Sequence, residues 1–278
     1  AAAADLLFML GLGIAVTKPV IKVRQKRQAP IILMVALMML ANLCFYLGAA
    51  GFLEQGVRIG IYGGLYLSLG MVLFMGRRVI PFFTERGVGY EVQLRNDKWN
   101  DIASIILYPL FVVSEVFLPF HFIGALLAGG LFISNSLRVM GWHTLGVWQK
   151  PLLWSLFAAF IMINLGFLLR AMMAVTTIPD LLPVHAFAVG GIGIITVGMM
   201  ARVTLGHTGR NVHRSPPVMT LLLAGMVLTT IIRIFLPLAN PSWYRVWIGA
   251  AGITWIISFA LFALVFSPML WRPRAGEH

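Results

Sequence analysis

Long apolar runs alternate with short polar connectors along the whole chain. A helix needs roughly 20 apolar residues in a row to cross the hydrocarbon core of a membrane. The pattern predicts nine such spans, at residues 1–17, 31–53, 57–76, 101–118, 120–138, 151–174, 181–205, 217–237 and 243–270. We therefore expect an all-α polytopic transmembrane helical bundle that forms one domain over residues 1–278. A polar loop is expected at 77–100 and a turn at Pro119.

Composition excludes a water-soluble globular protein. Of the 278 residues, 60% are hydrophobic and only 11% are charged, and the mean hydropathy is +0.91. Soluble domains carry about 25% charged residues, which they need for a wettable surface. The single cysteine, Cys44, lies in an apolar run, so the sequence contains neither a disulfide framework nor a cysteine-based zinc motif. The expected surroundings of the chain are a lipid bilayer.

Basic residues orient the predicted spans. When the connectors are assigned alternately to the two sides of the membrane, 17 of the 21 Lys and Arg fall on one side. The positive-inside rule makes that side cytoplasmic, which places the loop 77–100 and the last residue, His278, in the cytoplasm. The net charge of +12 thus comes from connectors near lipid headgroups, and no aromatic residues interleave with them. We therefore expect no nucleic-acid binding.

Small residues four positions apart predict where the spans contact one another. Close helix packing in lipid uses such residues, because they let two backbones approach. The sets are Gly60, Gly64 and Ser68; Gly124 and Ala128; and Ala186 and Gly190. The glycine-rich run at 190–193 lies inside an apolar span with no strand before it, so we reject a nucleotide-binding loop there.

The histidines divide between the two predicted faces. His121 and His185 lie near the outer ends of their spans, whereas His143, His207 and His213 lie on the cytoplasmic side. His185 and His207 are 22 residues apart in one helical segment, which corresponds to about 33 Å. They cannot bind the same metal ion. Shared chemistry would therefore require two centres, one near each face.

Ionisable residues within spans are costly and are functional candidates by default. Neutral imidazole is a common ligand of haem iron and copper, and His185 begins a helical turn after Pro183 in apolar surroundings. We predict His185, His121 and His207 as metal ligands; the alternative for each is a histidine bonded to nearby backbone. Glu115, at the outer end of the fourth span, is the predicted catalytic residue, because a carboxylate there can deliver protons to an outer centre. Its alternative is an ordinary interfacial acid.

Arg202 lies in the last turns of the seventh predicted span. Its guanidinium can extend to the lipid headgroups, as long basic side chains do at membrane interfaces. It can instead hold a carboxylate, such as a haem propionate, through two hydrogen bonds. Both alternatives stay open at this point.

Two blocks of the sequence resemble those of one protein family. The first runs from His185 to Arg210 and contains HAF at 185–187, GGIG at 190–193 and GMMARVTLGHTGR at 198–210. The second block, GRRVIPFFT, occupies residues 76–84. Both blocks, in their order along the chain, are similar to the signature of the NnrS family. The resemblance covers essentially the whole chain.

The resemblance implies a bacterial inner-membrane protein of about twelve spans that binds haem of the b type and copper. It also implies a link to nitric oxide metabolism or nitrosative-stress defence. Nine spans that begin outside and end inside fit a twelve-span protein without its first three, so some metal ligands are expected to lie beyond this chain. The positions that match the signature are His185, Arg202, His207 and Arg210, and we predict that Arg202 and Arg210 bind the cofactor.

Three classes of function stay open. The first is a haem and copper protein that binds or reduces nitric oxide at an intramembrane metal site. If it reduces nitric oxide it is an oxidoreductase similar to a nitric oxide reductase, with an electron donor or a second copy of the chain as partner. The second is a transporter or exporter without a redox centre, although neither an internal repeat nor midplane charges are visible. The third is a structural or assembly subunit without a cofactor.

Overall fold

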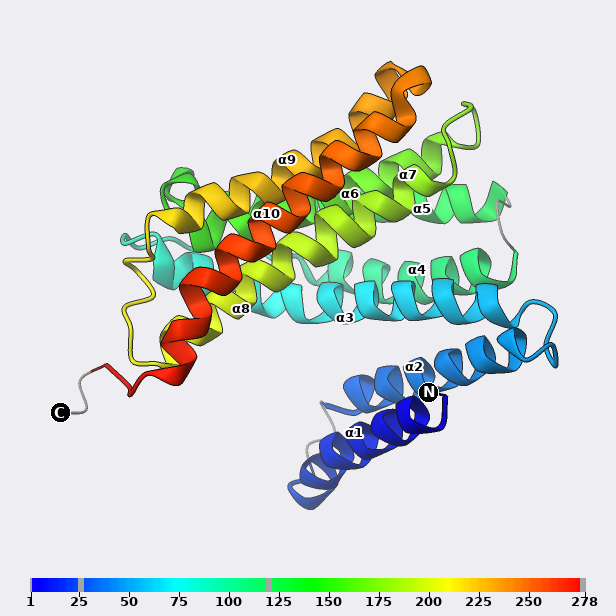
Figure 1. Ribbon diagram of the computed structural model, residues 1–278, viewed down its shortest axis with the longest axis horizontal. Helices are drawn as coiled ribbons and strands as arrows, with labels where there is room; N and C mark the ends of the chain where they lie inside the picture. The colour runs from blue at the N-terminus through cyan, green and yellow to red at the C-terminus, as the bar shows by residue number, and fades with distance from the viewer. Residues whose placement is uncertain (1, 25–27, 119–121, 276–278) are drawn as a thin grey trace. The chain divides into compact units, whose positions relative to one another are not determined.

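The computed structural model describes residues 2–24, 28–118 and 122–275. Within these residues the chain consists of helices joined by short connectors, and no strand occurs (Figure 1). In chain order the elements are α1 (Ala2–Lys22), α2 (Ala29–Ala49), α3 (Gly56–Gly87), α4 (Lys98–Phe117), α5 (Phe122–Trp142), η2 (Leu145–Gln149), α6 (Pro151–Met172), α7 (Leu181–His185), η3 (Ala186–Gly193), α8 (Ile194–His207), α9 (Val218–Ala239), η4 (Pro241–Trp243) and α10 (Tyr244–Trp271). The predicted all-α polytopic bundle is confirmed.

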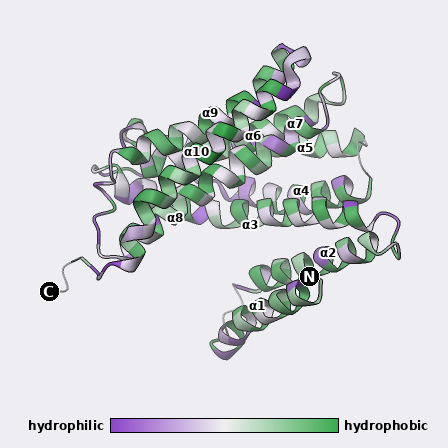
Figure 2. Ribbon diagram, in the orientation of Figure 1, coloured by the Kyte–Doolittle hydropathy of each residue, from purple (hydrophilic) through white to green (hydrophobic). Residues whose placement is uncertain are grey.

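Nine helical segments in the described part of the chain are long and apolar enough to cross a membrane. They correspond to the nine predicted spans, with α7, η3 and α8 forming one continuous segment, Leu181–His207. Figure 2 shows that hydrophobic residues dominate each of these long helices. Helices suit this environment because each one satisfies its backbone hydrogen bonds internally. The chain is therefore a multi-pass membrane protein.

Helix α3 is longer than its predicted span. It continues from residue 76 through Pro81 to Gly87, so only residues 88–97 of the predicted polar loop are non-helical. Hydropathy falls beyond residue 76, but Ile80 and Thr84, four apart on one face, are 1% and 0% exposed. Packing of this face within the protein thus continues the helix where the apolar run ends. The predicted turn at Pro119 lies outside the described residues.

The chain forms two compact units. The first unit comprises Ala1–Met75 and Tyr108–Gly124, and the second comprises Gly76–Leu107 and Ala125–His278. Helices α3, α4 and α5 each contribute residues to both.

In the first unit, α1 and α2 are joined through Asp5. Asn42 Nδ2 and Tyr46 OH both donate hydrogen bonds to Asp5 Oδ2, at 2.8 and 2.9 Å, which satisfies a carboxylate inside an apolar helix. Helix α2 then packs closely on α3, because a Cβ atom on Gly60 would lie 2.4 Å from Cβ of Phe45. The predicted role of Gly60 in helix contact is therefore confirmed.

In the second unit, α6 is the central helix. Its residues Phe160, Ile163 and Phe167 are at most 1% exposed, and it contacts α7, η3, α8 and α9. Helix α10 packs against α9 and α8 and exposes large apolar side chains such as Ile256 and Leu264. In a bilayer this exposure carries little cost, since lipid tails are as apolar as these side chains. The second unit thus has a protein core around α6 and a lipid-facing surface on α10.

The segment η3 is a π-helix within the seventh span. Its glycines lie directly against α6: a Cβ atom on Gly191 would be 2.3 Å from Cγ1 of Ile163, and one on Gly190 would be 2.6 Å from Cβ of Met162. No side chain fits at either contact, which confirms the predicted packing role of Gly190. π-Helical turns are rare and frequently occur at functional sites. This one begins directly after His185, so its contact with α6 positions that histidine.

Candidate functional site

The imidazole of His185 is held by two hydrogen bonds. Its Nδ1 lies 2.5 Å from the carbonyl oxygen of Leu181, one turn earlier, and its Nε2 lies 2.8 Å from Nη2 of Arg233 on α9. A guanidinium has donors only, so Nε2 must accept this hydrogen bond. The imidazole is therefore neutral, and the proton on Nδ1 is donated to the Leu181 carbonyl.

The surroundings of this pair are largely apolar. The immediate neighbours of His185 and Arg233 along the chain, Ala186 and Ile234, belong to a buried cluster with Leu169 and Leu182. Nη1 of Arg233 is buried and has no hydrogen-bond partner among the described residues. An unpaired donor in apolar surroundings is costly, and its cost is removed when an acceptor binds to it. The pair therefore holds one lone pair, on Nε2, which the Arg233 guanidinium occupies, and one donor that lacks an acceptor among the described residues.

This geometry fits an imidazole ligand of haem iron. Metal-binding histidines typically donate one ring N–H to a backbone carbonyl or carboxylate and present the other nitrogen to the metal. His185 already has the required tautomer, with Nδ1–H bonded to Leu181. The guanidinium of Arg233 occupies the direction of the Nε2 lone pair, so it must rotate away before iron binds. Its donors then become available to a carboxylate, such as a haem propionate.

The other predicted metal ligands do not join His185. His207 is exposed at the end of α8, about 33 Å from His185 along a continuous helix, and His121 lies outside the described residues. In the part of the chain that the structure describes, no three His, Cys, Asp or Glu side chains come together as a metal-binding group.

Arg202 lies on a different part of the second unit from His185. Its guanidinium stacks over the Phe83 ring at 4.0 Å and donates from Nη2 to the Leu152 carbonyl oxygen at 3.0 Å. Seventeen residues separate it from His185, which corresponds to about 25 Å along the helix. A single haem bound through its iron to His185 does not reach that far with its propionates.

Arg210 is engaged at two helix ends. Its Nη1 lies 3.5 Å from the carbonyl oxygens of Thr208 and of Met269, close to the ends of α8 and α10. A basic side chain at a helix C-terminus compensates its unpaired carbonyl groups. The structure thus gives Arg210 a local partner, and its predicted contact with a cofactor stays a prediction.

Glu115 is buried in the first unit. It is 5% exposed in the last turn of α4, and Arg58 donates to the backbone oxygens of Glu115 and Val116 at 2.9 and 2.6 Å. Arg58 therefore caps the C-terminal end of α4. His185 belongs to the second unit, so the predicted cooperation of the two residues stays a prediction.

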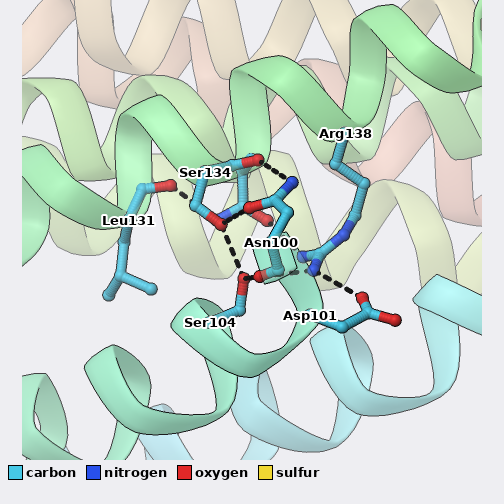
Figure 3. A network of polar contacts seen from close by, with 7 residues as sticks. Asn100, Asp101, Ser104, Leu131, Ser134 and Arg138 are labelled. Carbon is cyan, nitrogen blue, oxygen red and sulfur yellow. Dashed lines mark hydrogen bonds and ion pairs between the residues drawn. The ribbon is translucent and has the colours of Figure 1, made fainter. Parts of the chain in front are cut away.

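A buried polar network between α4 and α5 was missed from the sequence (Figure 3). Arg138, only 5% exposed, donates from Nη2 to Asp101 at 2.9 Å and to Ser104 at 3.1 Å. Asn100 Nδ2 donates to the backbone oxygen of Ser134 at 2.9 Å, and the Ser134 hydroxyl donates back to the Asn100 side chain. Such bonds hold neighbouring helices together in lipid. The available signal was the spacing of Asn100 and Ser104, four apart, near the end of one span.

These features define a class: a multi-pass helical membrane protein with a neutral, half-buried histidine held in the tautomer of a metal ligand. The model of one family, described as NnrS protein, matches residues 1–274. The chain therefore belongs to the NnrS family, and it is a membrane protein of a family related to nitric oxide. No curated protein and no solved structure matches the chain.

Proposed function

We propose that this chain is an integral haem- and copper-binding protein of the bacterial inner membrane, with its C-terminus in the cytoplasm. It acts in nitric oxide metabolism or nitrosative-stress defence, by binding or reducing nitric oxide at an intramembrane metal site. The observation that carries the proposal is His185, whose Nδ1–H is fixed on the Leu181 carbonyl while Nε2 retains a lone pair. Membership of the NnrS family supports the connection to nitric oxide.

His185 would hold the haem through Nε2, and the Leu181 carbonyl fixes the direction of the ring. Bound haem iron supplies an open coordination position and a redox centre. Arg233, once turned away from Nε2, donates to a carboxylate at the edge of the group. The buried cluster around Leu169 and Leu182 excludes water from this end of the bundle. Nitric oxide is small and apolar, so it can approach through the lipid.

Copper enters the proposal through the family resemblance. His121 and His207 are the further histidines proposed as metal ligands. Arg210, which is farther along the chain from His185 than Arg202 is, is proposed to bind a cofactor at a centre other than the one at His185. Since His207 lies far from His185, it would belong to a second centre near the cytoplasmic face, where an electron donor or a second copy of the chain can dock. No chemical step is assigned to that centre.

The first test is spectroscopic. The full-length protein, purified in mild detergent, is expected to show a Soret band that shifts on reduction with dithionite. The band is expected to shift again when nitric oxide is added, because one coordination position is open. Metal analysis of the same sample measures copper. If protein from cells supplied with haem precursor has no Soret band, the proposal is wrong and a transporter or an assembly subunit becomes the leading hypothesis.

Reduction of nitric oxide consumes protons, and we propose that Glu115 delivers them. Glu115→Gln is expected to lower nitric oxide consumption by proteoliposomes roughly 100-fold, the typical contribution of a general acid, while the Soret band is unchanged. Glu54→Gln, which changes an exposed acid of the first unit, is the matched control. Unchanged consumption by the Glu115 variant would exclude this residue from the reaction.

A further inference from the structure

A basic recess lies where α6 begins in the second unit. Its polar lining comes from three segments of the chain: Lys150 precedes α6, Arg202 lies on α8, and His213 and Ser215 lie in the connector before α9. None of the described residues that line it is acidic. Its free volume of about 20 Å³ exceeds the roughly 10–15 Å³ that one water-sized group requires. One oxygen of an oxyanion therefore fits inside, with its other atoms at the mouth.

The guanidinium of Arg202 is positioned in advance for such an oxygen. The Phe83 ring and the Leu152 carbonyl fix its plane and its Nη2 group. Its Nε is buried and has no acceptor among the described residues. A guanidinium bonds phosphate and carboxylate oxygens through neighbouring N–H groups. The arrangement thus lacks one acceptor that an oxyanion would supply.

The first turn of α6 adds to the positive potential of the recess. The helix begins with Pro151, and Lys150 before it has an extended backbone and makes no side-chain capping bond. Pro151 has no N–H and the Leu153 N–H donates to the Lys150 carbonyl oxygen at 2.9 Å, so it is mainly the partial positive charge of the helix start that favours an anion here. Together with Lys150 and Arg202, this end of α6 therefore carries a positive charge that no acidic residue in the lining compensates.

A second, apolar groove also borders the first half of α6. The groove has a free volume of about 400 Å³ and is lined by Trp154 and Ala158 of α6 and by residues of α9 that include Leu228. Trp154 and Ala158 are four residues apart and therefore lie on one face of α6, and Lys150 directly precedes the helix. This end of α6 thus carries a positive charge at the end of the span and apolar side chains toward its middle. A phospholipid has the complementary order of groups.

We propose that this face of the second unit binds one anionic phospholipid. One phosphate oxygen occupies the recess between Lys150, Arg202 and His213, and one acyl chain lies in the groove between α6 and α9. Basic pockets between helices on the cytoplasmic side of membrane proteins bind such headgroups, and the predicted topology places Lys150 and Arg202 on that side. An anionic lipid fits better than a zwitterionic one, because a choline ammonium beside the phosphate would meet two positive side chains. The site is independent of the haem proposed at His185.

The test uses tryptophan quenching, since Trp148 and Trp154 line the groove. The full-length protein is placed in phosphatidylcholine bilayers that contain a minor fraction of lipid with brominated acyl chains, either phosphatidylglycerol or phosphatidylcholine. We expect stronger quenching by the brominated phosphatidylglycerol. The double variant Lys150→Gln with Arg202→Gln is expected to remove the excess quenching by phosphatidylglycerol. Each lost charge weakens the preference for the anionic lipid roughly fivefold, the equivalent of about 1 kcal/mol. Lys150→Gln with His213→Gln, which leaves the Phe83–Arg202 stack intact, reduces it as well.

The control is Lys98→Gln with Arg272→Gln, which removes two exposed positive charges that neither line nor adjoin the recess, and it is expected to keep the preference. Equal quenching by both lipids, or an excess that survives in both recess variants, would overturn the proposal. Complete competition by inorganic phosphate would also overturn it, and would assign the recess to a soluble anion. If the recess variants lose haem absorption while their lipid preference is unchanged, the recess binds a haem propionate and the proposal is wrong.

Discussion

The variant His185→Gly is expected to lose at least nine-tenths of the Soret absorption of the purified protein, and imidazole added during purification is expected to restore it. The glycine removes the proposed ligand and leaves a space that free imidazole can enter, beside the Leu181 carbonyl and Arg233. Groups that only hydrogen-bond to a metal ligand typically contribute about 10–100-fold to metal affinity, so loss of the ligand itself is expected to lower the affinity by more than that. The measurement is haem content per protein, from the absorption spectrum.

His143→Ala is the control for this experiment, because His143 is exposed in a connector, where its Nε2 accepts a hydrogen bond from Trp148 Nε1 at 3.0 Å. Its Soret band should be that of the unchanged protein. Recovery with imidazole separates ligation from folding, since a misfolded protein would not regain its spectrum. A Soret band of full height in the glycine variant would show that another residue holds the haem.

The variant Gly191→Ala is expected to destabilise the second unit by about 1–3 kcal/mol, the usual cost of an added methyl group in a closely packed core. The new Cβ would lie 2.3 Å from Cγ1 of Ile163, which is close to the backbone of α6 and cannot swing away as the tip of a long side chain does. The measurement is the midpoint of thermal unfolding in detergent. A lower haem content should accompany the loss, because the same contact positions His185.

Gly252→Ala on α10 is the matched control, since no atom lies within 4 Å of the position of its Cβ. A double-mutant cycle sharpens the test. Ile163→Ala removes the Cγ1 atom and is destabilising by itself, but combined with Gly191→Ala it should cost less than the sum of the two changes. Strict additivity would mean that the glycine does not contact α6 as described.

The apolar pattern was sufficient to predict the spans, because a helix that crosses lipid must be apolar over its whole length. It was insufficient at the end of α3, where Ile80 and Thr84 face the protein core and not lipid. It also could not predict the π-helix at 186–193. The glycines of this segment lie against α6, α9 and α10, and these contacts depend on the tertiary arrangement.

The candidate site was predictable only in part. His185 could be selected because a histidine inside a span is unusual. Its bond to the Leu181 carbonyl is local, four residues away, and belongs to both alternatives weighed for this residue. The contact with Arg233 spans 48 residues and depends on which helices are neighbours. The same holds for Arg138 and Asp101, which the sequence placed at the ends of two different spans and the structure joins in one ion pair.

The π-helix also rotates the two ends of the seventh span relative to each other about the helix axis. A π-helical turn arises where the hydrogen-bond spacing grows from four residues to five, in effect by one additional residue. Each additional residue rotates everything beyond it by about 100° relative to a regular α-helix. A single helical wheel drawn through 181–207 therefore assigns the wrong azimuth to one end. His185 points toward α9, and Arg202 points toward α6 and Phe83. These two directions are therefore set independently along the one helix. A change of length within 186–193 would alter one of them without the other.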